Sequence, residues 1–177
     1  AKKADGTPNL LIDDFGKKID SLTKGIYNES GFEFNVNSTQ QLAKILFDVK
    51  GLPEIKKRST AEDVLEQLKG KHILPEMVLE FRKLNKLKNT YIDALPELIN
   101  QSSGRIHSTF NQAMTATGRL SSSNPNFQNI PIKTQEGREI RKAFRSRDPN
   151  WLIFSADYSQ IELRIMAHLS QDEALVY

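Results

Sequence analysis

The chain has 177 residues, of which 25 are basic, 22 are acidic and none is cysteine, and its mean hydropathy is −0.51. This length corresponds to one or two domains. The hydropathy predicts a soluble protein, because no run approaches the roughly 18 apolar residues that a membrane span needs. The absence of cysteine excludes a disulfide framework, a thiolate metal site and a cysteine nucleophile, and it fits a reducing intracellular setting. Because the chain begins with Ala rather than Met, we expect it to be a piece of a longer protein.

The net charge of +3 conceals an uneven distribution along the chain. Residues 1–104 carry 16 basic and 15 acidic side chains, residues 105–147 carry eight and two, and residues 148–177 carry one and five. A basic block followed by an acidic one is the pattern expected of a phosphate-binding surface next to a carboxylate site for cations. Solvated runs of charge give the same pattern more often, so charge alone leaves both interpretations open.

Helices are predicted for the first part of the chain. Residues 1–8 are charged and interrupted by Gly and Pro, and we expect them to form a disordered leader. Apolar residues then recur at helical spacing up to Ile26, which predicts a helix that Asn9 caps and Gly31 follows. The same spacing predicts a second helix over residues 39–49.

Capping signals mark the next helix starts. Ser38 and Gln41 form a capping-box pattern at the beginning of the second helix. A short third helix is predicted to begin at Thr60, which has an acidic residue three positions later, and to end at Gly70. The longest periodic segment covers residues 74–99 and predicts a helix of about seven turns.

The longest predicted helix carries a dense basic stretch. Its four members are Arg82, Lys83, Lys86 and Lys88. An exposed helical face is the ordinary explanation for such a run. Antiparallel packing of these helices predicts an elongated helical region over residues 9–100.

The composition changes after residue 100. Alternation over residues 105–110 predicts a strand, and the polar residues that follow predict surface loop or ligand-contacting backbone. A helix is predicted over 136–144, a short apolar strand over 151–154 and a further helix over 161–169. The chain is therefore predicted to be α+β and mainly helical.

An acidic residue directly follows the apolar run of 151–154. A buried strand would hold the carboxylate of Asp157 rigidly at a sheet edge, where Mg²⁺, which prefers oxygen ligands, could bind. Glu162 follows in the first turn of the next predicted helix. The alternative is that Asp157 is a solvated cap and that Glu162 is favoured there by the helix dipole.

A second candidate site lies in the polar segment. Arg119 is the single charged residue between Ile106 and Ile132, and small residues flank it. The amide side chains that follow it are Asn124, Asn126, Gln128 and Asn129. Such donors suit the minor groove of DNA, whose acceptors are similar for every base pair. An ordinary polar loop is the alternative.

Three segments resemble the bacterial DNA polymerase I family, that is, the family A DNA polymerases. They are TATGRLSSSNPNFQNIPI (115–132), EGREIRKAF (136–144) and ADYSQIELRIMAHLS (156–170). The resemblance extends through almost the whole chain. It implies a helical thumb over residues 9–100, followed by a partial antiparallel-sheet palm over 101–177.

The resemblance also implies roles at the acidic site. Asp157 would bind both catalytic Mg²⁺ ions, and the Tyr158 carbonyl would complete the coordination of one of them. Glu162 would pack against the incoming sugar and exclude a ribose 2′-hydroxyl. The implied contacts to the incoming nucleotide come from Tyr158, Ser159, Gln160, Ile161 and Glu162.

Contacts to DNA are implied for the basic and amide side chains. Arg119 would reach the minor groove at the primer terminus. Arg82 and Lys86 would touch the duplex backbone. The side chains implied to lie near the primer and template are Asn126, Gln128 and Asn129.

The implied activity is template-directed DNA synthesis by two-metal catalysis in a longer DNA polymerase I chain. The second carboxylate motif and the fingers helix of the family do not occur in these 177 residues. We therefore expect the chain alone to bind DNA without polymerising. A non-enzymatic, sequence-independent DNA-binding module is the main alternative, and a purely structural helical interaction protein is a third.

The implied partners are a primer–template duplex and deoxynucleoside triphosphates, with two Mg²⁺ ions in the complete polymerase and no membrane. The implied location is the bacterial cytoplasm, in association with the nucleoid. Unpaired strand edges of the partial palm could also make the chain dimerise.

Overall fold

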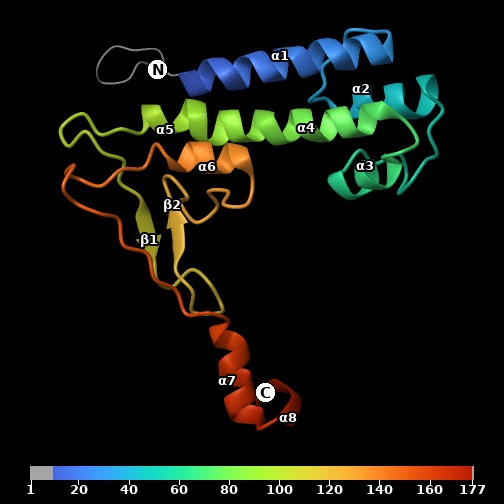
Figure 1. The fold of residues 1–177 in the computed structure, drawn as a ribbon. Coiled ribbons are helices and arrows are strands. Elements are labelled where there is room, and N and C mark those ends of the chain that lie inside the picture. Colours follow the sequence, from blue (N-terminus) through green and yellow to red (C-terminus); the bar gives the residue numbers. More distant parts are fainter. Residues whose placement is uncertain (1–9, 177) are drawn as a thin grey trace. The chain divides into compact units, whose positions relative to one another are not determined.

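The computed structural model describes residues 10–176, so the leader predicted over 1–8 and the cap predicted at Asn9 lie outside the described residues. The chain forms two compact units, the first ending at Arg141 and the second beginning at Lys142. The elements of the first unit are six α-helices, two π-helical segments and two strands within its described residues (Figure 1). The fold is α+β and mainly helical, as the sequence predicts.

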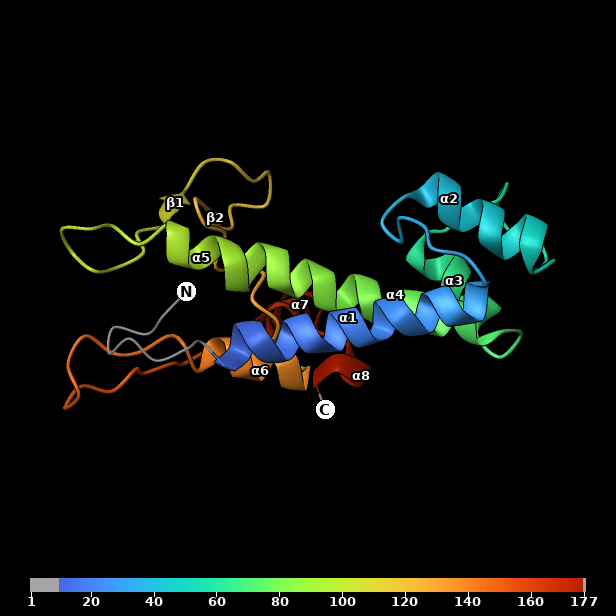
Figure 2. The same ribbon diagram turned by 90° about the horizontal axis from the view of Figure 1, so that it is seen from above.

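Two long helical segments run side by side through the first unit. Helix α1 (Leu10–Ser30) packs against α4 (Ile73–Leu87) and against the π-helical segment η2 (Lys88–Asp93), which leads directly into α5 (Ala94–Glu97). Figure 2 shows α1 lying along the α4–α5 rod. The predicted first helix and the predicted helix over 74–99 are confirmed, although the pattern of apolar residues gave no sign of the π-helical turn inside the second.

Three shorter segments complete the helical region. They are α2 (Thr39–Ala43), the π-helical segment η1 (Lys44–Val49) and α3 (Glu62–Leu68). The Ser38 hydroxyl accepts from the Gln41 N–H at 3.4 Å, so the predicted cap is confirmed, but the Gln41 side chain turns instead to the Asn35 N–H. Ala61, not Thr60, occupies the cap position of α3. Thr60 instead accepts hydrogen bonds from Arg82.

The core of the first unit lies between these helices. Its apolar side chains come from both long helices and from all three short segments, so the pieces bury one shared surface. The buried members are Ile26, Val36, Leu42, Ile45, Leu46, Phe47, Leu52, Val64, Leu65, Leu68, Leu74, Val78 and Phe81. Burial on this scale makes the helical region a stable platform for the polar segments that follow it.

A small sheet and one helix follow α5 in the chain. Strands β1 (Thr109–Asn111) and β2 (Ser121–Ser123) pair antiparallel, with Phe110 opposite Ser122. The strand predicted over 105–110 is thus confirmed only at its last two residues. Helix α6 (Gln135–Arg141) matches the helix predicted over 136–144 at its start and ends three residues earlier.

The second unit contains α7 (Ile161–Ser170) and α8 (Glu173–Val176), and α7 confirms the helix predicted over 161–169. The strand predicted over 151–154 is wrong: these residues are irregular, and their side chains are 59–93% exposed. A strand needs a neighbour for its N–H and C=O groups. Within residues 10–176 the sheet contains only β1 and β2, so that neighbour is missing. No described helix is long and apolar enough to cross a membrane.

Candidate functional site

A tight turn presents Arg119 at the surface of the first unit. The Thr115 hydroxyl donates to the Arg119 carbonyl at 2.6 Å, and the Gly118 N–H donates to the Thr115 carbonyl at 3.3 Å. Gly118 has a φ of +72°, a conformation that a side chain disfavours. These contacts fix the backbone of the turn and leave the Arg119 side chain exposed.

Serine hydroxyls shape the loop that follows β2. Ser122 is only 5% exposed, and its oxygen accepts from the Phe127 N–H at 3.0 Å. Ser108, which lies just before β1, donates to the Pro125 carbonyl at 2.7 Å. The loop is therefore tied to the two-stranded sheet through its backbone. Neither serine stands out in the sequence, because serine is common in loops that bind nothing.

Four amide side chains lie on this loop, which we call the polar loop (residues 124–131). Asn124, Asn126, Gln128 and Asn129 are all exposed. The Gln128 side chain donates to the Leu120 carbonyl at 2.9 Å, and the Gln128 N–H donates to the Asn126 side-chain oxygen at 2.9 Å. The first of these bonds joins the polar loop to the segment just after Arg119. The structure thus brings the predicted amide cluster and the Arg119 turn into one polar surface.

The dense basic stretch, which runs from α4 into the first residue of η2, does not form one exposed face. Lys83 pairs with Glu80 of its own helix at 3.4 Å and with Glu136 of α6 at 3.3 Å. Lys88 pairs with Asp93 at 2.6 Å. Burial alone would lower the pKa of Lys83, but the two carboxylates outweigh it and raise that pKa. Lys83 therefore joins α4 to α6.

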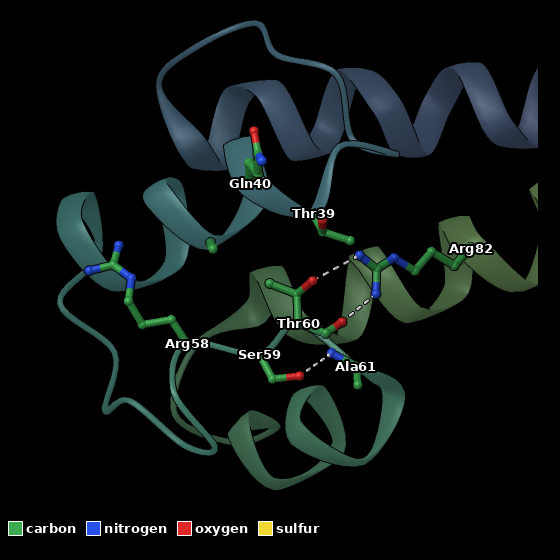
Figure 3. A pocket seen from close by; sticks show the side chains of 8 residues that line it. Thr39, Gln40, Arg58, Ser59, Thr60, Ala61 and Arg82 are labelled. Atoms are coloured by element: carbon green, nitrogen blue, oxygen red, sulfur yellow. Dashed lines mark hydrogen bonds between the residues drawn. The ribbon is translucent and has the colours of Figure 1, made fainter.

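The two side chains of α4 that are predicted to touch the DNA backbone differ in their surroundings. Lys86 is exposed in the last turn of the helix. Arg82 is half-buried and donates to both the carbonyl and the hydroxyl of Thr60, the hydroxyl bond being 3.3 Å long (Figure 3). Loss of water around the guanidinium lowers its pKa. Arg82 thus holds the loop before α3, and only its remaining N–H groups are available to another partner.

A pocket of about 430 Å³ lies beside Arg82, and sequence analysis did not foresee it. Its walls come from α2, from α4 and from the basic loop before α3 (Figure 3). The lining residues are Thr39, Gln40, Ala43, Arg58, Ser59, Thr60, Ala61 and Arg82. Arg58 pairs with Asp48 at 2.7 Å and with Glu54 at 3.1 Å, which raises its pKa. Both guanidinium groups of the pocket are therefore already bound to the protein.

The second candidate site lies in the second unit, at the start of α7. Asp157, Tyr158 and Ser159 are exposed and precede Gln160, which has a φ of 51° at the cap position of the helix. The Arg164 side chain donates to the Ser159 carbonyl at 2.9 Å and so steadies this turn. Ile161 and Glu162 lie in the first turn of α7 and are also exposed.

This turn offers oxygen ligands of the type that Mg²⁺ prefers, but too few of them to form a complete site. Asp157 supplies one carboxylate, and the Tyr158 carbonyl supplies a second oxygen. Across residues 10–176, no group of three or more His, Cys, Asp or Glu side chains is arranged to hold a metal ion. Mg²⁺ sites of enzymes rely on protein carboxylates together with substrate phosphates and waters. The described residues therefore do not form a complete metal site by themselves.

Comparisons with known proteins agree along almost the whole chain. The family model for DNA polymerase family A matches residues 9–177. The chain is 49% identical to DNA polymerase I of Geobacillus stearothermophilus over 164 residues, which is 90% of this chain and 19% of that protein. It is 51% identical to the thermostable DNA polymerase I of Thermus aquaticus over 166 residues, 90% of this chain and 20% of that one.

A solved structure is similar as well. It is the POL domain of Pol1 from M. smegmatis in complex with DNA primer-template and dNTP, with a TM-score of 0.81 and 41% sequence identity. The similarity covers 94% of this chain and 30% of that one. The chain spans about a fifth of the length of the curated relatives it matches.

Proposed function

The chain belongs to DNA polymerase family A, and on this premise we propose that it is the part of a longer DNA polymerase that holds the primer–template duplex. The longer protein would join a deoxynucleotide to the primer: the primer 3′-hydroxyl attacks the α-phosphate of a deoxynucleoside triphosphate, and pyrophosphate leaves. The observation that carries this proposal is the polar surface of Arg119 and the polar loop. It lies within the 169 residues matched by the family model, residues 9–177.

Duplex binding would divide between phosphate and minor-groove contacts. We assign Lys86 to the phosphate backbone, because its ammonium is exposed on a stable helix. Arg119 and the amides of Asn126, Gln128 and Asn129 would face the minor groove, whose acceptors vary little with sequence. Arg82 could reach a phosphate only with the N–H groups that Thr60 leaves available. In this proposal residues 9–100 act as a thumb and residues 101–177 as part of a palm.

The turn before α7 would contribute to the catalytic centre. Bound Mg²⁺ ions would stabilise the negative charge that develops on the transferred phosphate. Asp157 and the Tyr158 carbonyl would supply part of their ligands, and the remaining carboxylates would come from elsewhere in the longer protein. The backbone of Ser159 and the side chains of the following turn would line the nucleotide site. Glu162 would exclude a ribose 2′-hydroxyl from it.

The proposal places the longer protein in the bacterial cytoplasm, where it would act on nucleoid DNA. For the 177-residue chain itself, the exposed apolar segment 151–154 offers a surface through which two copies could associate. Size-exclusion chromatography with light scattering would measure such dimerisation.

Two assays on the purified chain test the proposal. We expect it to bind a fluorescent primer–template duplex with an affinity that falls as salt rises. We also expect the chain to bind duplexes of unrelated sequence with equal affinity. In a primer-extension assay with Mg²⁺ and all four deoxynucleotides, we expect no product above the level without protein. Undetectable duplex binding at low salt would contradict the DNA-holding role, and template-dependent extension would contradict the predicted inactivity of the chain alone.

A further inference from the structure

Three successive backbone carbonyls of the polar loop are each bound by a side chain from η2 or from α6. The Tyr91 hydroxyl, from η2, donates to the carbonyl of Asn129. Arg141, the last residue of α6, donates from Nη2 to the Ile130 carbonyl at 3.4 Å and from Nε to the Pro131 carbonyl at 3.2 Å. Surface loops usually satisfy such groups with water. Here two protein side chains fix the end of the loop instead.

The attachment uses the backbone and leaves the amide side chains outward. Ile130 is 9% exposed, so its side chain is buried. Asn126, Gln128 and Asn129 remain exposed on the same short segment. The loop is therefore held through its backbone while these three amide side chains stay exposed.

Tyr91 is the helical residue best placed to control this arrangement. It is 8% exposed and lies within the π-helical turn η2, where the extra residue per turn alters the direction of the side chains. Burial raises the pKa of its phenol, so the hydroxyl keeps its proton and remains a donor at neutral pH. Its side chain is buried, and its hydroxyl binds the polar loop at the Asn129 carbonyl.

We propose that Tyr91 is a positioning residue for duplex binding: its hydroxyl, acting through the Asn129 carbonyl, holds the polar loop in the conformation that meets DNA. This inference rests on the proposed function, in which Asn126, Gln128 and Asn129 face the duplex. A loop that is ordered before binding avoids the entropy loss of ordering on binding. Tyr91 itself touches no DNA in this arrangement.

The test removes the hydroxyl alone. Tyr91→Phe keeps the buried ring, and Tyr27→Phe serves as the matched control, because Tyr27 lies on α1 and packs against the Phe34 ring, with centroids 6.0 Å apart. Both variants and the unaltered chain are titrated with a fluorescent primer–template duplex at several KCl concentrations. We expect Tyr91→Phe to raise Kd about three- to tenfold at every salt concentration, from the cost of ordering a loop on binding.

Two readouts separate positioning from general damage. The slope of log Kd against log salt should not change, because the number of phosphate contacts is the same. Amide hydrogen exchange of residues 128–130, measured without DNA, should accelerate in Tyr91→Phe and not in Tyr27→Phe. The thermal midpoint of each variant shows that the helical region remains folded.

The outcomes distinguish the inference from the proposed function. Normal duplex binding by the unaltered chain with an unchanged Kd for Tyr91→Phe would overturn the role of Tyr91 and leave the proposed function intact. Unchanged exchange at residues 128–130 would overturn it as well. Failure of the unaltered chain to bind duplex would refute the proposed function itself, while faster exchange in Tyr91→Phe would still show that the hydroxyl orders the loop.

Discussion

At Gly137 the backbone of α6 closely approaches the end of the polar loop. An ideal Cβ there would lie 2.6 Å from the Cβ of Pro131, 2.7 Å from its carbonyl oxygen and 2.9 Å from its carbonyl carbon. Two of these three atoms belong to the backbone, so no change of rotamer relieves the overlap. The Arg141 side chain also binds that carbonyl, which resists displacement of the turn. Gly137→Ala must therefore move α6 away from Pro131.

The expected cost follows from these distances. Overpacking of a closely packed contact costs about 1–3 kcal/mol, and the higher helix propensity of Ala returns up to about 1 kcal/mol. Because all three distances are below 3.0 Å, we expect the overlap to outweigh the helix propensity, so that Gly137→Ala lowers the free energy of unfolding by up to about 2 kcal/mol. Gly16→Ala is the matched control, because its added Cβ, in the interior of α1, meets nothing within 4 Å. That variant should raise the free energy of unfolding by up to about 1 kcal/mol.

Urea unfolding followed by circular dichroism measures both variants against the unaltered chain. Opposite shifts of the transition midpoint, downward for Gly137→Ala and upward for Gly16→Ala, are the expected result. If Gly137→Ala proves as stable as the unaltered chain, then α6 does not pack against Pro131 as described. In that case the attachment of the polar loop to the helical region would need to be reconsidered.

Three further predictions concern charged side chains. Arg82→Ala leaves the carbonyl and hydroxyl of buried Thr60 without their donor, and we expect urea unfolding to show a loss of about 2 kcal/mol; an unchanged midpoint would contradict the structural role of Arg82. Lys86→Ala should keep the urea midpoint, weaken duplex binding equally for all sequences and reduce the magnitude of the salt slope by about one. A slope that stays the same would remove Lys86 from the phosphate contacts. Burial alone would raise the pKa of Glu136, but its backbone hydrogen bond and Lys83 outweigh it and lower that pKa. The stability gained from this carboxylate is therefore present above its unfolded pKa and is lost as pH falls through the lower folded value. Glu136→Gln should lower the free energy of unfolding by about 1 kcal/mol at pH 7, and the difference should vanish in strong acid; a difference that is independent of pH would argue against the ion pair.

Helices were the part of the fold that the sequence predicted well. The end of α1 just before Gly31 and the cap at Ser38 both follow from neighbouring residues, because helical hydrogen bonds and caps join groups three or four positions apart. The π-helical turn η2 was not foreseen. The apolar residues of η2 fit the spacing of an ordinary α-helix, so the sequence pattern does not reveal the one additional residue in the π-helical turn.

The strand predicted over 151–154 failed for a different reason. Four consecutive apolar residues satisfy a local rule, but a strand exists only when a neighbouring strand pairs with it. A pairing strand can come from any distance along a chain, so the residues near 151–154 do not show whether one is present. The expectation that a strand would hold Asp157 rigidly failed with it, although the oxygen donors of Asp157 and Tyr158 remain together on the turn before α7.

The basic stretch of α4 shows most clearly what tertiary structure adds. The basic run alone did not distinguish Arg82, Lys83 and Lys86, and the family resemblance implied phosphate contacts for Arg82 and Lys86 alike. In the folded chain Arg82 holds Thr60 and Lys83 holds Glu136, which are 22 and 53 positions away, while Lys86 stays exposed. A charged donor binds whichever acceptor the fold brings near, and no local pattern encodes that choice.

The sequence by itself determined the family and the helical character of this protein, because motif strings and apolar periodicity are properties of neighbouring residues. It also located the amide side chains of the polar loop. Only the tertiary structure decided how that loop is held. Tyr91 and Arg141 come from helices on either side of it in the sequence, and the chain must fold before their donors can meet the same three carbonyls.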